Sequence, residues 1–215
     1  MDRSHVIIVY EIIAFVFAIC VHESAHAWVA NKCGDPTARM LGRISLNPIK
    51  HVDPIGTILV PALGILSHIG FIGWAKPTPV DPRNLRHPIR DDILTSLAGP
   101  ASNLLIACVA TAGLMAIGLL AGSRGIGPGS ILIPLALLLR VFVAINILLA
   151  AFNLIPIPPL DGSHVIRHLL PESGKRVYDM IGWFGILLLF FIGGPIIAIF
   201  QYPFVRFFSL FVPGL

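Results

Sequence analysis

The chain has 215 residues, of which 56% are hydrophobic and only 12% are charged. A soluble domain of this length carries about 25% charged residues, so the composition excludes an ordinary soluble protein and indicates a polytopic membrane protein. The formal net charge of +4 does not indicate nucleic-acid binding, because the basic residues lie between apolar runs, where they set membrane topology. We therefore expect a single membrane domain over residues 1–215, with no nucleic-acid partner.

Residues 5–28 form the first expected membrane span, because a helix needs about 20 apolar residues to cross the hydrocarbon core. The far end of this span carries the sequence HESAH at 22–26, which is the pattern HExxH. Histidines at i and i+4 lie on one helix face, where His22 and His26 can bind one zinc ion. Glu23 could then activate a water molecule as general base. Ionisable groups at membrane depth are costly, so this setting favours a functional site.

The segment from residue 31 to residue 90 has basic ends around an apolar middle. Residues 40–46 alternate loosely between apolar and polar, which predicts a short strand. Residues 54–72 are apolar, and the positive-inside rule places both of their basic flanks on the cytoplasmic side. We therefore predict a re-entrant hairpin at 54–72, bent near 61–64 and surrounded by protein or a water-filled cavity; a short full span is the alternative.

Further spans are expected at residues 92–121, 131–154 and 177–200, and residues 201–215 are expected at the membrane interface. The fold class is an all-α polytopic membrane protein, a bundle of about four to six transmembrane helices with a small β element near the active site. The loop at 122–130 is poor in basic residues, unlike the other loops. We therefore predict a multi-pass protein of the cell membrane, with its N-terminus outside and the HExxH motif toward the cytoplasm.

Two charged residues interrupt the apolar spans. Under the predicted topology, Glu11 and Arg140 both lie in the outer half of the membrane. Charged residues within membrane spans tend to pair, so we predict a Glu11–Arg140 ion pair. The alternative is that each side chain reaches the outer interface separately.

A catalytic zinc ion takes three protein ligands and keeps one open position, so a third ligand is needed. Asp161 is the best candidate, because it follows a proline-broken segment at the cytoplasmic end of its span, at the expected depth of His22 and His26. An ordinary Asp-Gly turn is the alternative explanation. His164, three residues further on, is a competing ligand. We expect one zinc ion per chain.

Three motifs, in this order, resemble the site-2 protease family, whose members are intramembrane zinc metalloproteases. They are HExxH in the first span, AGPASN at 98–103 and NLIPIPPLDG at 153–162. The resemblance covers nearly the whole chain. It implies that His22, His26 and Asp161 bind zinc and that Glu23 is the general base. It also implies that Asn153 orients the substrate or stabilises the oxyanion.

Residues 42–54 and 73–77 are similar to a small prokaryotic branch of the same family, and no PDZ-like or CBS-like domain is seen. Asn103 ends the second motif and His51 lies within the 42–54 match, so both are candidates for substrate contacts. A strand near 43–46 or 73–76 could hold an unwound substrate by edge pairing.

These observations predict a zinc endopeptidase that cuts peptide bonds within or near transmembrane segments of other proteins in the lipid bilayer. A zinc-binding membrane protein without peptidase activity, either a transporter or a pseudoprotease scaffold, is the alternative. A metalloenzyme acting on lipid or prenyl substrates is a second alternative. Glu23 favours an enzyme, because a transporter needs metal ligands but no general base between them. The sequence carries no signal for oligomeric state.

Overall fold

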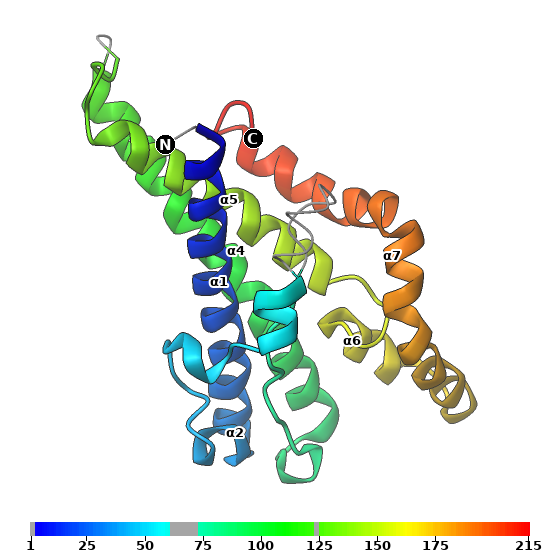
Figure 1. Cartoon of the computed structure of the whole chain (residues 1–215). Coiled ribbons are helices and arrows are strands. Elements are labelled where there is room, and N and C mark those ends of the chain that lie inside the picture. The colour runs from blue at the N-terminus through cyan, green and yellow to red at the C-terminus, as the bar shows by residue number, and fades with distance from the viewer. Residues whose placement is uncertain (1–2, 61–72, 123–124) are drawn as a thin grey trace. The chain divides into compact units, whose positions relative to one another are not determined.

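The computed structural model describes residues 3–60, 73–122 and 125–215. The chain divides into two compact units. We name Met1–Ala18 with Pro100–Leu215 the helical unit, and Ile19–Gly99, which carries the HExxH sequence, the motif unit. Helices α1 (Arg3–Cys33) and α4 (Pro88–Ala121), which are labelled in Figure 1, each contribute residues to both units.

The remaining elements in the described residues are all helical. Between α1 and α4, the described residues form α2 (Thr37–Met40) and three short 3-10 or π helices, namely η1 (Pro48–Lys50), η2 (Pro54–Leu59) and η3 (Pro82–Asn84). After α4 come α5 (Leu132–Asn153), α6 (Asp161–Leu169) and α7 (Glu172–Ser209).

The predicted small β element is not confirmed, since no strand occurs within residues 3–60, 73–122 and 125–215. At 40–46, α2 ends and the chain continues in turns, with Gly42 at a φ of +67°. A left-handed residue of this kind interrupts the extended backbone that a strand requires.

Within the described residues, three helices are long and apolar enough to cross a membrane: α1 from His5 onward, α4 and α5. These candidate spans coincide with those predicted at 5–28, 92–121 and 131–154, whereas the count of four to six is not confirmed. The predicted hairpin at 54–72 begins in η2, and its residues 61–72 lie outside the described part of the chain.

Three Asx–Pro pairs start the short helices of the motif unit. Asn47, Asp53 and Asp81 each accept a hydrogen bond from a backbone amide of the following turn, and a proline comes next in every case. An Asx cap satisfies an otherwise unpaired helical amide, and proline at the first helical position lacks the amide that would need a partner. These pairs explain why a region without long helices still has a defined backbone.

The helical unit has an apolar core made by α4, α5 and the end of α7. Its buried members are Ala107, Ala110, Val143, Ile147 and Phe208. Small alanines let helix backbones approach closely, which is how helices associate inside a membrane.

A buried amide pair lies in the same unit as this core. Asn103 Nδ2 donates to Asn146 Oδ1 at 2.9 Å, and both side chains are 0% exposed. Asn103 Nδ2 also lies 3.5 Å from the carbonyl oxygen of Ala18, and Asn146 donates to the carbonyl of Phe142. The pair therefore links α1, α4 and α5 within the helical unit.

The predicted Glu11–Arg140 ion pair is wrong. Both residues belong to the helical unit, and among the described residues no ion pair joins them. Arg140 Nη2 instead donates to the carbonyl oxygen of Pro213 at 2.6 Å. The reason is that the C-terminal turn after α7 offers a carbonyl acceptor within reach of the guanidinium.

Helix α7 contains the predicted span at 177–200 and continues through most of the segment expected at the interface. The helix changes direction along its length in Figure 1, and Pro195 and Pro203 lie inside it. A proline within a helix removes one backbone hydrogen bond and bends the axis. The segment at 201–209 is therefore a continuation of α7 and not a separate element.

Candidate metal centre and active site

The two histidines of the HExxH sequence lie close together on one face of α1. Their ring centroids are 4.6 Å apart, with the rings edge to face at 80°. His22 is 7% exposed and His26 is 8% exposed, so both imidazoles are withdrawn from solvent. The 3.6-residue helical repeat brings side chains at i and i+4 together, which is the geometry that the motif predicts.

A backbone carbonyl fixes the protonation of His26. Its Nδ1 lies 2.7 Å from the carbonyl oxygen of Thr95 in α4. A carbonyl can only accept, so Nδ1 carries a hydrogen and Nε2 is the nitrogen suited to a metal ion. Metal-ligating histidines commonly use their second nitrogen in this way.

Gly99 leaves room for the two imidazoles. A Cβ atom built on Gly99 would lie 2.3 Å from His26 Nε2 and 2.5 Å from His22 Nε2. Any other residue at this position would occupy the space beside the nitrogens that a metal ion needs. Two buried imidazoles with their Nε2 atoms beside a cleared backbone fit zinc, which favours nitrogen ligands.

Glu23 lies between the two histidines in sequence and is held by one distant residue. The backbone amide of Thr78 donates to Glu23 Oε2 at 2.8 Å, and Thr78 Oγ1 lies 2.7 Å from the same oxygen. Thr78 Oγ1 is also 3.0 Å from the carbonyl oxygen of Glu23. The carboxylate is therefore oriented, with both donors directed to Oε2.

Arg43 organises the backbone around Thr78. Its guanidinium donates to the carbonyls of Lys50, Lys76 and Pro77, although the side chain is only 5% exposed. A buried cation is tolerated when backbone carbonyls surround it. Arg43 thus ties the loop after α2 to the segment that reaches Glu23.

His51 also contacts the segment that leads to Thr78, and it links this segment to Ser45 and to α1. Its Nε2 donates to the Ser45 carbonyl at 2.6 Å and lies 3.4 Å from Ser24 Oγ, and its own carbonyl accepts from the amide of Lys76 at 2.8 Å. Burial lowers the pKa of His51 below its usual value; the bond to the Ser45 carbonyl acts against this, and the Arg43 guanidinium adds to it. A neutral His51 that donates through Nε2 is the expected form.

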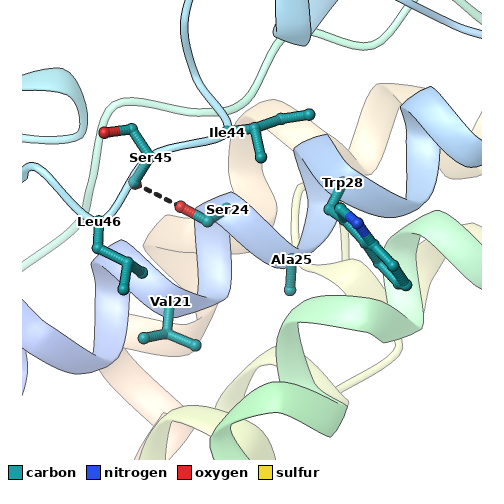
Figure 2. A pocket seen from close by; sticks show the side chains of 7 residues that line it. All are labelled: Val21, Ser24, Ala25, Trp28, Ile44, Ser45 and Leu46. Atoms are coloured by element: carbon teal, nitrogen blue, oxygen red, sulfur yellow. Dashed lines mark hydrogen bonds between the residues drawn. The ribbon is translucent and has the colours of Figure 1, made fainter.

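A groove of about 380 Å³ runs along another face of α1 (Figure 2). It is lined by Val21, Ser24, Ala25, Trp28, Ile44, Ser45 and Leu46, and the Ser24 hydroxyl bonds the Ser45 carbonyl across one wall. These α1 residues recur at helical spacing on a face separate from that of His22 and His26. The groove is mostly apolar, and none of its lining residues is titratable. The groove therefore offers no general base and no histidine or carboxylate ligand for a metal ion.

Asn153, Asp161 and His164 belong to the helical unit. Asn153 is the last residue of α5, and its side-chain amide donates to the Leu149 carbonyl at 2.9 Å. Asp161 is the first residue of α6, with His164 one turn later. A Cβ on Gly162 would lie 2.3 Å from the Leu154 carbonyl oxygen, so only glycine permits this close approach at the start of α6.

The structure thus brings His22, Glu23 and His26 into one neighbourhood of the motif unit, and places His51 in the loop that supports it. Asn103 is fully buried and engaged with Asn146, and its role as a substrate contact stays a prediction. Sequence reasoning did not single out Thr78, and it noted Arg43 only within the 42–54 match and the strand predicted at 43–46. The only available signal for Thr78 was its place between two prolines.

Comparison with known proteins adds an independent observation. The sequence model described as Peptidase family M50 matches residues 130–192. A Bacillus subtilis protein named "Putative zinc metalloprotease YwhC" is 38% identical over 185 residues, which cover 83% of this chain and 77% of the relative. The chain belongs to the M50 family of site-2 proteases.

Mycobacterial relatives agree with this M50 assignment. A Mycolicibacterium smegmatis protein named "Putative zinc metalloprotease Rip2" is 31% identical over 175 residues, covering 80% of this chain and 62% of that protein. The Mycobacterium tuberculosis protein of the same name is 27% identical over 185 residues, with coverages of 80% and 61%. No solved structure matches the chain.

Proposed function

We propose that this M50 protein is a zinc-dependent intramembrane endopeptidase that hydrolyses peptide bonds within or near transmembrane segments of other membrane proteins. The observation that carries the proposal is the arrangement of the HExxH helix. Two buried imidazoles share a face cleared by Gly99, and an oriented carboxylate lies between them in sequence. Metal ligands alone would need no general base, so Glu23 supports an enzyme over a transporter or scaffold.

His22, His26 and Asp161 are the residues proposed to hold one zinc ion per chain. The two histidines are supported by their spacing, burial and protonation. Asp161 is proposed from the sequence, as a carboxylate that follows the proline-broken segment within the residues matched by the family model. When bound, zinc would supply a Lewis acid that lowers the pKa of a water molecule toward ~7 and polarises the substrate carbonyl.

Glu23 would accept a proton from the attacking water and return it to the leaving amine. A bond forms between the water oxygen and the acyl carbon, the peptide C–N bond breaks, and the proton ends on the new amine. Asn153 is proposed to donate its amide hydrogen to the substrate oxygen as negative charge develops there. A substrate helix must unwind first, because its carbonyls are hydrogen-bonded and shielded by the helix.

The proposed orientation in the membrane is based on the distribution of basic residues. The distribution of basic residues supports a cell-membrane protein with its N-terminus outside and Glu23 toward the cytoplasm. Trp28 and Lys32 lie at the same end of α1, with the ammonium 5.8 Å from the indole ring centre. Aromatic and basic residues of this kind occur at the membrane–water interface. The whole chain is proposed to act as one protease domain on transmembrane protein substrates.

The test is cleavage of a panel of single-span helices by the purified protein in lipid, with bound zinc measured in the same samples. Wild type should cut at least one helix. Glu23→Gln should hold the same zinc and lose cleavage by about 100-fold or more, since general-base catalysis contributes on that order. If both proteins hold zinc and cut at equal rates, Glu23 is not the base. If both hold zinc and neither cuts any helix, a transporter or scaffold would be favoured.

A further inference from the structure

The contact between Thr78 and Glu23 has no counterpart in the sequence motifs. Thr78 lies in the segment between η2 and η3, and it directs both its backbone amide and its hydroxyl to Oε2 of the carboxylate, at 2.8 and 2.7 Å. The two residues are 55 positions apart, so the bond depends entirely on the fold of the motif unit. Both donors converge on one oxygen, which leaves Oε1 as the oxygen without a Thr78 donor.

The local sequence makes Thr78 a rigid donor. It stands between Pro77 and Pro79. Each proline fixes its own φ, and residues that precede a proline are restricted to extended conformations. Proline has no amide hydrogen, so Thr78 supplies the only backbone donor of these three residues, and that donor is used on Glu23.

The segment is also anchored directly before Thr78. The Lys76 amide donates to the His51 carbonyl at 2.8 Å. The Arg43 guanidinium bonds the carbonyls of Lys76 and Pro77, the latter at 3.0 Å. Hydrogen bonds from a cation are shorter and stronger than neutral ones. Three contacts within two residues therefore hold the backbone where Thr78 meets Glu23.

We infer that Thr78 is a positioning residue for the general base. It holds Glu23 by Oε2, so that Oε1 is the oxygen that exchanges the proton with water and the leaving amine. A rigid, anchored donor suits positioning better than gating, because a gate must move away from its partner. This inference rests on the proposed peptidase function.

Kinetics test the inference with two variants and a matched control. Thr78→Val removes the hydroxyl and keeps the shape, and Thr78→Ser keeps the hydroxyl. Thr37→Val is the control, because Thr37 also directs its amide and hydroxyl to a carboxylate, that of Asp35, within the same unit.

Thr78→Val should lower kcat by about 10–100-fold, with KM and bound zinc unchanged, as is typical when support for a catalytic group is lost. Thr78→Ser should restore most of the rate, and Thr37→Val should match wild type. An unchanged kcat in Thr78→Val, or a rise in KM alone, would overturn the inference. A faster Thr78→Val variant would also overturn it, because Thr78 would then be restraining Glu23.

Amide hydrogen exchange tests the same contact without any substrate. Pro77 and Pro79 have no amide hydrogen, so exchange at Thr78 is separated from its neighbours. Glu23→Ala should accelerate exchange at Thr78 and leave Thr37 as in wild type. Unchanged exchange at Thr78 would overturn the inference whether or not wild type cuts a helix. Faster exchange together with an inactive wild type would support the contact and count against the proposed peptidase function.

Discussion

The motif unit and the helical unit hold their buried polar groups in different ways. In the motif unit, side chains such as Arg43 and Asp53 bond the backbone of irregular segments. In the helical unit, backbone groups are largely paired within long helices, and polar side chains such as Asn103 and Asn146 bond between or along those helices. Irregular backbone at membrane depth needs fixed partners, whereas a helix satisfies its own.

Because the two units hold their polar groups differently, substitutions in them should have different effects. In the motif unit, Arg43 holds the backbone at Lys76 and Pro77, directly before Thr78, which bonds Glu23. A change there should therefore alter chemistry. In the helical unit, the bond between Asn103 and Asn146 joins two long helices, so a change there should alter stability. Two predictions test this contrast and a third concerns the stability of the motif unit itself; they run from the largest expected effect to the smallest.

Gly99→Ala should weaken zinc binding by about 10–100-fold, the range seen when groups supporting metal ligands are changed. The added methyl group would lie within 2.5 Å of both imidazoles, which must rotate away. The clashing atoms are the ends of side chains, so the fold should survive. Zinc affinity measured by competition with a chelating dye checks the effect.

Gly118→Ala is the matched control for this experiment. Gly118 lies in the same helix, and apart from the nearby backbone of that helix, no atom of the described residues lies within 4 Å of a Cβ built there. Its zinc affinity should equal that of wild type. Equal affinities in all three proteins would mean that Gly99 does not make room for the ligands, and the contrast between the two units would fail.

Asn103→Leu and Asn146→Leu should each lower the free energy of unfolding by about 1–3 kcal/mol, because each removes the hydrogen bond between two buried amides. The double variant should lose less than the sum of the two, with a coupling of about 0.6–1.7 kcal/mol. Unfolding in detergent checks this, and strictly additive losses would contradict it. A rise in KM at unchanged stability would instead support Asn103 as a substrate contact.

Acidification should reduce stability through His51. Its pKa is lower in the folded protein than the ordinary value of 6.5, so the unfolded chain binds more protons between these two values. The contribution of His51 to the free energy of unfolding is therefore fully present above pH 6.5 and is lost as pH falls below 6.5 toward the folded pKa. Unfolding temperature measured between about pH 7.5 and 5.5 in the zinc-loaded protein checks this.

Two histidine variants isolate the effect of His51. His51→Gln should flatten the pH dependence, because it removes the buried imidazole. His87→Gln should keep the dependence of wild type, since His87 is exposed in the same unit. The interpretation would be wrong if both variants retained the same slope as wild type.

Local patterns were enough to predict much of the helical framework. Apolar length alone located the spans in α1, α4 and α5, and helical periodicity placed His22 and His26 on one face. These features depend on residues within a few turns of one another, so the sequence contains the information directly.

Features that depend on distant contacts were not predictable in the same way. The alternation at 40–46 predicted a strand. The polar residue Arg43 in this pattern is instead buried and donates hydrogen bonds to backbone carbonyls up to 34 residues away. Thr78 reaches Glu23 across 55 residues, and no local pattern encodes that bond. Arg140 donates to the carbonyl of Pro213, whereas its opposite charge had predicted an ion pair with Glu11. A hydrogen bond from a side chain to a distant backbone carbonyl requires no particular residue type at the carbonyl, so the sequence gives no sign of it.

The prolines on either side of Thr78 also act on the unfolded chain. Each one limits the conformations that this segment can visit before folding, so less chain entropy is lost when Thr78 meets Glu23. Replacing either proline with alanine could preserve every native contact and still favour the unfolded state by about 0.4–1 kcal/mol. The carboxylate of Glu23 would then be oriented by a segment whose order depends more steeply on temperature.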